Sequence, residues 1–330
     1  MNGNIKYPGN RKRFPTDEVD PENFISDDDV KKMIKNLDTI EFAQDDYNKL
    51  YNCVHCGACE TEIERIKLKE KFLEQGLTLE GLKEMIECFD KYRSPYPSNK
   101  MRICRFEEIP SQSETLYFMG CLSTIRIPRY TEHSLEYLLK QGVDFTILDT
   151  EICCGWPWFA SGSMKEFETC IEENIEIFKN YKKIICLCPA CYFLFNQYYK
   201  PKMDKNIEIQ YIAEYLKASK EKKSGKVGVQ HLCQLINRGK KGVEKSIDAL
   251  LEESGYEVAD IPHWCCGGGI GYMHRTDIIE AVAQKRMEDF NKEDIDFATT
   301  YCPSCWWILA RFSKKFKIKP KAKDLFELLL

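Results

Sequence analysis

Residues 152–155 read Ile152-Cys153-Cys154-Gly155, and residues 264–267 read Trp264-Cys265-Cys266-Gly267. Each doublet belongs to a longer set, in which a single cysteine precedes it and a Cys-Pro-x-Cys motif follows it. The first set comprises Cys121, Cys153, Cys154, Cys188 and Cys191, and the second comprises Cys233, Cys265, Cys266, Cys302 and Cys305. The offset between the sets is 112 residues at the single cysteine and the doublet, and 114 residues at the last motif. Because ten cysteines keep their register, the sequence predicts an internal structural repeat.

The stretches between these cysteines predict short strands that alternate with helices in both copies. In the first copy we expect strands at 115–119, 144–152 and 183–187 and helices at 130–140 and 165–181. In the second copy we expect strands at 226–230, 256–261 and 295–300 and helices at 242–253 and 276–291. This order predicts an α/β fold of two pseudo-symmetric lobes, residues 111–222 and 223–330, with the cysteines at strand ends.

Residues 1–110 differ in composition and are expected to form an N-terminal arm followed by a small, mostly helical domain. This region contains Cys53-x-x-Cys56-x-x-Cys59, the first part of a ferredoxin run whose next cysteine position is occupied by Ile63. Three thiolates at this spacing can hold three irons of a cubane [4Fe-4S] cluster.

The fourth ligand of such a cluster has to come from elsewhere in the chain. Cys88 and Cys104 are the candidates, and Cys88 is preferred because it lies in the same helical region, before a linker at 93–98. A three-cysteine zinc site completed by His55 or another residue is the alternative. Zinc ligands usually come as separated pairs, which favours the iron-sulfur cluster.

Each repeated set offers five thiolates, one more than common metal sites use. Zinc closes its tetrahedral shell with four ligands, and an ordinary cubane cluster also needs only four cysteines. A set of five fits a cluster in which one cysteine bridges two irons. Cys170 and Cys186 have no cysteine at the corresponding position of the other copy, so we expect them to be core residues.

Composition excludes several classes of protein. The 330 residues carry a formal net charge of −4 without a long basic block, so no nucleic-acid partner is expected. The longest strongly apolar run, 184–195, is shorter than the about 20 residues of a membrane span. Residues 1–15 lack the apolar segment of a secretory signal, which favours the cytoplasm. In that reducing compartment, 17 cysteines indicate metal or redox chemistry.

The cysteine pattern is C-x31-CCG-x32-CPxC in the first copy and C-x31-CCG-x34-CPxC in the second. It resembles the paired cysteine-rich CCG domains of the heterodisulfide reductase B subunit and its fused D-type relatives, over about 116–330. The flanking residues Tyr117-Phe-Met-Gly-Cys121 and His231-Leu-Cys233 share the resemblance. It implies that each set of five binds a noncubane [4Fe-4S] cluster and that the two clusters face one another across a substrate pocket.

The resemblance also implies an activity and partners. A reductase of this type would cleave a disulfide, such as the heterodisulfide of coenzyme M and coenzyme B, with the N-terminal cubane as electron relay. A flavoprotein, a ferredoxin-like protein or a cytochrome subunit would supply the electrons. The N-terminal region is similar to a C-type electron-input domain, but such domains hold two complete motifs and this chain keeps three cysteines of one.

Two other functions fit the same cysteines. The chain could be a non-catalytic iron-sulfur subunit beside a flavoprotein, as in glycolate- or lactate-oxidising complexes, or a zinc-stapled interaction protein. The two complete sets of five favour catalysis. Near the cysteines, Gly267-Gly-Gly-Ile-Gly271 predicts a close backbone approach to a cluster or substrate. Gly155-Trp-Pro-Trp-Phe159 predicts either an aromatic pocket wall or core packing, and His231 and His263 either proton donors or, preferably, structural hydrogen bonds.

Overall fold

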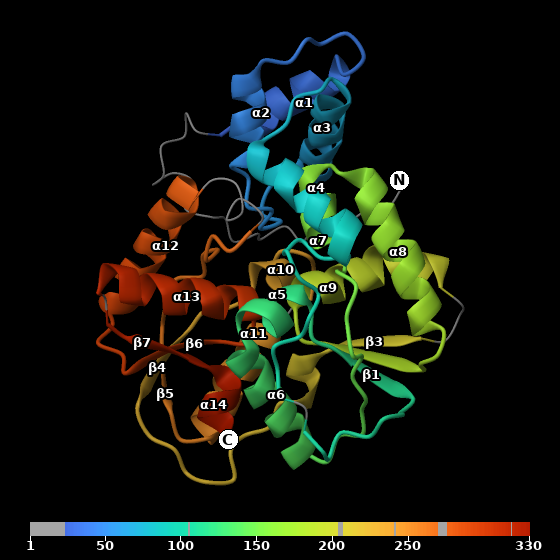
Figure 1. Ribbon diagram of the computed structural model, residues 1–330. Coiled ribbons are helices and arrows are strands. Elements are labelled where there is room, and N and C mark those ends of the chain that lie inside the picture. The colour runs from blue at the N-terminus through green and yellow to red at the C-terminus, as the bar shows by residue number, and fades with distance from the viewer. Residues whose placement is uncertain (1–23, 105, 204–206, 241, 270–275, 318) are drawn as a thin grey trace.

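The computed structural model describes residues 24–104, 106–203, 207–240, 242–269, 276–317 and 319–330. Two α/β lobes lie side by side, and a small helical unit sits above them (Figure 1). The predicted N-terminal arm falls mainly on residues 1–23, outside the described residues. None of the helices in the described ranges combines the length and apolarity that a membrane crossing requires.

The N-terminal unit is helical, as the sequence predicts. Its helices are α1 (Asp27–Lys35), α2 (Gln44–Tyr51), α3 (Glu62–Glu74) and α4 (Glu80–Tyr92). Ser26 caps α1 by accepting a hydrogen bond from the Asp29 N–H. Acidic residues in the first turn stabilise the helix further, because they interact favourably with the positive end of its dipole. Helix α4 buries Leu82, Met85 and Phe89 on one face.

The first lobe is built on a parallel sheet with the strand order β1-β2-β3. Its strands are β1 (Thr115–Phe118), β2 (Lys183–Cys186) and β3 (Glu208–Tyr211). Its α-helices are α5 (Cys121–Arg126), α6 (Pro128–Lys140), α7 (Trp156–Ser161), α8 (Met164–Phe178) and α9 (Pro189–Leu194). A π-helix, η2 (Phe195–Tyr199), and the 3-10 helices η3 (Lys200–Lys202) and η4 (Ile212–Tyr215) complete it.

The second lobe repeats this arrangement on a parallel sheet with the order β5-β4-β6-β7. Its strands are β4 (Lys226–Val229), β5 (Glu257–Ala259), β6 (Phe297–Thr300) and β7 (Lys321–Asp324). Its helices are α10 (Cys233–Ile236), α11 (Val243–Glu253), α12 (Thr276–Asn291), α13 (Pro303–Phe316) and α14 (Leu325–Leu329). The α/β class and the two-lobe repeat are therefore confirmed.

The strand predicted at 144–152 does not form. One isolated parallel bridge, Leu116 to Thr146, stands where the second lobe has the whole of β5. The rest of the segment satisfies its polar groups elsewhere: Glu151 accepts backbone hydrogen bonds after β1, and the Cys153 N–H donates to the Arg93 carbonyl at 2.9 Å. These contacts turn the chain away from the sheet.

Two cores hold the parts together. One joins the lobes, where Phe326 of α14 packs against Tyr130 and Tyr137 of α6 with ring centroids 5.5 and 5.9 Å apart. The other joins the N-terminal unit to the first lobe, with Phe89 of α4 against Trp158 of α7 at 4.9 Å. Cysteines of the second set belong to the first of these cores, and Cys154 and Cys191 of the first set belong to the other.

Candidate metal centres

The structure brings the five cysteines of the first set together. We call Cys121, Cys153, Cys154, Cys188 and Cys191 the first pentad. Cys121 begins α5 directly after β1, and the Cys-Pro-x-Cys motif begins α9 directly after β2. The sulfurs of Cys121 and Cys153 are 3.8 Å apart. Thiol hydrogen bonds continue in the order 153, 154, 191, 188, so the five sulfurs form one connected group.

The second set forms the same connected group in the other lobe. We call Cys233, Cys265, Cys266, Cys302 and Cys305 the second pentad. The sulfurs of Cys233 and Cys265 are 3.6 Å apart, and those of Cys266 and Cys305 are 3.2 Å apart. The contacts follow the order 233, 265, 266, 305, 302, which matches the first lobe position by position. All ten are free thiols rather than disulfides.

Protonation within each pentad follows from these contacts. The hydrogen bonds from Cys265 and Cys305 lower the pKa of Cys266 well below its usual range. Burial opposes the same effect at Cys154, but the hydrogen bonds from Cys153 and Cys191 lower its pKa too. A thiolate in each doublet is therefore surrounded by thiols that are costly to ionise in a buried site. A metal centre removes this cost, because bound thiols are deprotonated by the metal. The donor sets thus fit a metal cluster.

Polar side chains of the two lobes fix the loops that carry the single cysteines. Glu151 accepts the backbone N–H groups of Met119 and Gly120 at 2.7 and 2.6 Å, directly before Cys121. Burial raises the pKa of Glu151 to about 8. In the second lobe, Gln230 donates to the carbonyls of His231 and Trp264.

The two histidines near the second pentad are predicted to be structural residues or proton donors. The ring of His231 contacts the Tyr301 hydroxyl at 3.3 Å and the Asp248 carboxylate at 3.1 Å. His263 packs beside it with ring centroids 4.7 Å apart. The contacts of His231 are those of a structural residue.

A pocket opens between the two pentads. Its walls carry sulfurs from both lobes, aromatic rings and small residues. They are Pro95, Tyr96, Gly120, Cys121, Leu122, Ser123, Cys154, Trp156, Pro157, Cys188, Pro189, Ala190, Cys191, Gln234, Gly268, Gly269, Cys302, Ser304 and Trp307. The pentads face one another here, since Cys188 of the first and Cys302 of the second line the same pocket.

The aromatic and glycine segments predicted near the cysteines divide between pocket and core. Trp156 lines the pocket, whereas Trp158 and Phe159 are buried in the core. A Cβ at Gly269 would lie 2.9 Å from the backbone carbon of Val54, so this glycine approaches the N-terminal loop. Gly268 lines the pocket, so the predicted approach of the backbone to a substrate stays a prediction at this residue. Residues 270 and 271 lie outside the described residues. Cys170 and Cys186 are fully buried, as predicted.

The three N-terminal cysteines Cys53, Cys56 and Cys59, which we call the trio, lie on the loop between α2 and α3. Burial raises the pKa of the Cys56 thiol well above its usual range, and the charges of Cys233 and Cys53 raise it further. The trio therefore lies beside the second pentad. Sequence reasoning did not predict this neighbourhood.

Helix α10 and the residues after it hold the loop in this place. Gln234 and Arg238 each donate to the His55 carbonyl at 2.9 Å, and Asn237 donates to the Cys56 carbonyl at 2.9 Å. Arg238 also pairs with Glu62 of α3. These side chains lie about 180 residues from the loop in sequence, and no local motif marks them as its partners.

The candidates for the fourth ligand of the trio have other neighbours. Burial, with the charges of Glu84 and Glu87 of the same helix, raises the pKa of Cys88. Cys104 is exposed, and its backbone N–H donates to Glu132 at 2.8 Å. Cys88 as fourth ligand stays a prediction.

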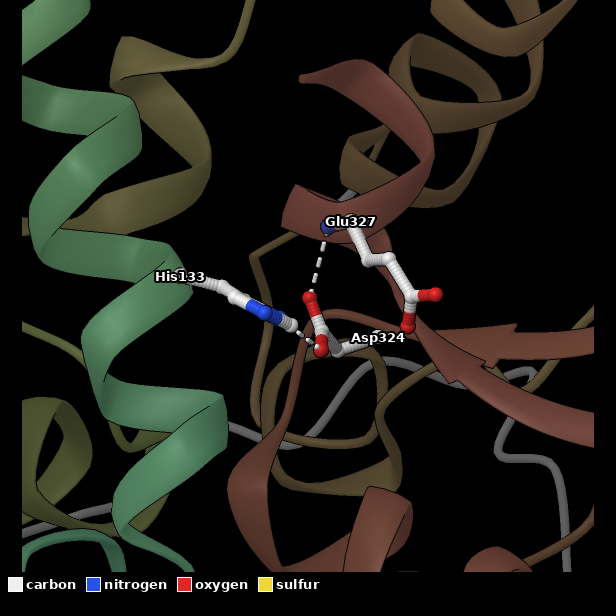
Figure 2. Close-up of side chains that lie close together, drawn as sticks. All are labelled: His133, Asp324 and Glu327. Carbon is white, nitrogen blue, oxygen red and sulfur yellow. Dashed lines mark hydrogen bonds and ion pairs between the residues drawn. The ribbon is translucent and has the colours of Figure 1, made fainter.

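A separate group of three possible ligands joins the lobes at the end of β7 (Figure 2). His133 of α6 contacts one carboxylate oxygen of Asp324 at 2.8 Å, and the other oxygen accepts the Glu327 N–H at 2.7 Å as the N-cap of α14. Glu327 also pairs with Lys323 at 3.2 Å. These groups satisfy one another, so the cluster acts as a helix cap and an inter-lobe ion pair.

Comparison with known proteins agrees with this geometry. The cysteine-rich CCG domain matches residues 115–196 and 227–310, which is half of the chain. An uncharacterized iron-sulfur protein of Methanococcus maripaludis is 24% identical over 94% of this chain and 63% of its own length. The B subunit of the fumarate reductase (CoM/CoB) of Methanothermobacter marburgensis is 27% identical over 57% of this chain and 40% of its own. Lactate utilization protein A of Bacillus cereus is 24% identical over 54% of this chain and 83% of its own length.

A solved structure shares the fold. The crystal structure of a hypothetical protein from Helicobacter pylori superposes with a TM-score of 0.54 at 12% identity, covering 93% of this chain and 67% of the other. The chain spans about 60% of the length of the two iron-sulfur relatives that match most of it. With a matching domain in each lobe, the chain belongs to the family of proteins that carry the cysteine-rich CCG domain.

Proposed function

We propose that this chain is an iron-sulfur electron-transfer protein. Each pentad holds a noncubane [4Fe-4S] cluster, and the trio holds a cubane [4Fe-4S] cluster with Cys88 as its predicted fourth ligand. The support is the identical order of sulfur contacts in the two lobes, which gathers five thiols where zinc would need four. The relatives named as iron-sulfur proteins support the same cofactor class.

We further propose that the chain catalyses disulfide reduction, with a heterodisulfide of the coenzyme M and coenzyme B type as substrate. The observation that carries this proposal is the pocket, which exposes Cys188 of one pentad and Cys302 of the other to the same space. The fumarate reductase relative, whose name includes CoM and CoB, supports thiol or disulfide chemistry of this kind.

The residues of the chain would prepare the substrate for this reaction. Bound clusters would supply single electrons and iron sites for the two sulfurs that separate. Tyr96, Trp156 and Trp307 line the pocket and would provide apolar walls around the disulfide. Ser123 and Ser304 offer hydroxyl groups that can orient its polar substituents.

The source of electrons is a partner in this proposal, either a flavoprotein, a ferredoxin-like protein or a cytochrome subunit. Electrons would enter at the trio and pass to the second pentad, because Cys56 and Cys233 are neighbours. Two facing clusters suit a two-electron cleavage, because iron-sulfur clusters pass electrons singly.

A second candidate is a non-catalytic electron-transfer subunit beside a flavoprotein. The similarity to lactate utilization protein A favours it. In that case the pocket would be a contact site or a remnant, and no disulfide would be cleaved.

Thiol release from the heterodisulfide, with reduced methyl viologen as artificial donor, separates the two candidates. The anaerobic wild-type chain should contain about twelve irons by the three-cluster count and should release thiols. Cys154→Ser or Cys266→Ser should abolish release, whereas Cys170→Ala, outside both pentads, should retain it. Wild-type protein that carries iron but releases no thiol would support the electron-transfer subunit. Undiminished release by either doublet variant would refute the catalytic assignment.

A further inference from the structure

The two lobes place different charges beside their matching pentads. Helices α8 and α12 are repeat mates with an offset of 112 residues, so Asn174 and Arg286 occupy corresponding positions. Both side chains are buried, at 0% and 2% exposure. Asn174 is neutral and donates to the carbonyls of Cys153 and Cys170 at 3.1 and 2.9 Å. The second lobe therefore has a buried cation where the first has an amide.

Protein contacts hold Arg286 in place but leave one nitrogen of its guanidinium without a hydrogen-bond acceptor among the described residues. Its Nε donates to Gln230 at 2.5 Å, its Nη1 donates to the Pro262 carbonyl, and Asp289 lies 3.6 Å from Nη1. Its Nη2 is buried and has no hydrogen-bond partner among the described residues. An N–H group in this state fits an acceptor such as a cluster sulfur.

The charge of Arg286 acts on the second pentad. Burial lowers the pKa of Arg286 to about 10, while the charges of Asp289, Cys266 and Cys305 oppose this effect. Arginine is a cation at neutral pH. Gln230, which accepts from Nε of Arg286, donates to the carbonyl of Trp264 directly before Cys265, so the guanidinium is held next to the doublet of the second pentad.

The buried Asp289 lies 3.6 Å from Nη1 of Arg286 and offsets part of its charge, while Lys292 pairs with the same carboxylate at 3.5 Å. The other charges near the two pentads do not favour the first lobe. Glu151 beside the first pentad is neutral or anionic, so it adds no positive charge there. Near the first pentad, Arg93 is 39% exposed and pairs with Glu173. Arg126 is exposed, and the surrounding solvent screens its charge. The buried Arg238 of the second lobe is paired with Glu62.

Reduction adds negative charge to a cluster, and a buried cation stabilises that charge strongly in a low dielectric. We propose that Arg286 makes the cluster of the second pentad the first of the two lobe clusters to accept an electron. This inference rests on the proposed clusters. In the step, one electron leaves the reduced cluster of the trio and enters the cluster of the second pentad, and no bond is made or broken. The second electron would then reduce the cluster of the first pentad.

The position of the trio fits this order. Cys56 lies beside Cys233, so the electron arrives at the lobe that carries the buried cation. The first pentad is reached across the pocket, on the side of Cys188. The position of the trio and the charge of Arg286 therefore both favour the second lobe as the first to accept an electron.

The test is a mediated redox titration of the anaerobic full chain, followed by EPR and Mössbauer spectroscopy. Cys53→Ser identifies the signal of the trio. Of the two lobe signals, the one reduced first should shift in Arg286→Gln to a lower potential, by at least about tenfold in the reduction equilibrium constant, or about 59 mV for one electron. Arg286→Lys keeps the positive charge, so its potential should stay close to that of the wild-type protein. Lys292→Gln removes an exposed lysine directly after α12 and should leave the potential nearly unchanged.

A second variant covers the case in which Arg286→Gln does not fold. Asp289→Asn removes the carboxylate that partly offsets Arg286, so the same signal should move to a higher potential. The inference is overturned if these variants move the lobe signal that is reduced last, or neither signal. A wild-type protein without lobe iron-sulfur signals would overturn the proposed function itself, and the inference with it.

Discussion

Removing Arg238 should loosen the loop that carries the trio. Its guanidinium pairs with Glu62, and the two side chains are only 3% and 2% exposed. Arg238 also donates to the His55 carbonyl at 2.9 Å and stacks over the Phe193 ring at 4.6 Å. Arg238→Met keeps the apolar stem in place but leaves the Glu62 carboxylate buried without this cation.

The expected magnitude follows from the burial of the pair. Removing one partner of a buried ion pair costs about 3–5 kcal/mol. Since each 1.4 kcal/mol is about tenfold in an equilibrium constant, local opening of the loop and of α3 should become roughly 100- to 3,000-fold more frequent. Native-state hydrogen exchange of peptides from 53–74 measures this opening directly.

Two further variants make the test specific. Glu62→Gln/Arg238→Met should cost less than the sum of the single changes by at least about 1 kcal/mol, because the residues are coupled. Lys240→Met breaks the more exposed pair with Glu214 and should cost about 1 kcal/mol or less. Exchange that rises less than about tenfold in Arg238→Met, or additive costs in the double variant, would refute the reasoning.

The remaining predictions concern two other contacts. Gly269→Ala places a carbon 2.9 Å from the Val54 backbone, so it should speed exchange in the trio loop but leave the lobe clusters bound; unchanged exchange would contradict this. The hydrogen bond with Asp324 raises the pKa of His133, so this ion pair should stabilise the fold fully below pH about 6.5 and lose its effect as the pH rises through the folded-state pKa. The unfolding free energies of wild type and His133→Gln should therefore converge on going from pH 6 to pH 9; a growing difference would be contrary to the prediction.

The repeated cysteines made the two-lobe fold predictable, because each single cysteine and each Cys-Pro-x-Cys motif follows a short apolar strand. Local sequence could not reveal that 144–152 leaves the sheet. Its apolar residues suit a strand, but the carboxylate of Glu151 and the backbone contact with Arg93 are tertiary interactions that override this preference.

The grouping of the ten cysteines could be predicted from the sequence, whereas their surroundings could not. The two pentads were evident from spacing alone. The position of the trio beside Cys233 depends on Gln234, Asn237 and Arg238, whose hydrogen bonds to the loop join residues far apart in the chain. Arg286 carried no signal either, because a single arginine in an amphipathic helix usually indicates a solvated face.

We propose that five sulfurs in each lobe enclose one iron-sulfur cluster. Anomalous diffraction at the iron edge from crystals of the anaerobically prepared chain tests it most directly. We expect iron density enclosed by the first pentad and by the second pentad, with each doublet bound through both sulfurs. Zinc with four ligands in either lobe, or a doublet whose sulfurs are unbound or joined in a disulfide, would contradict it.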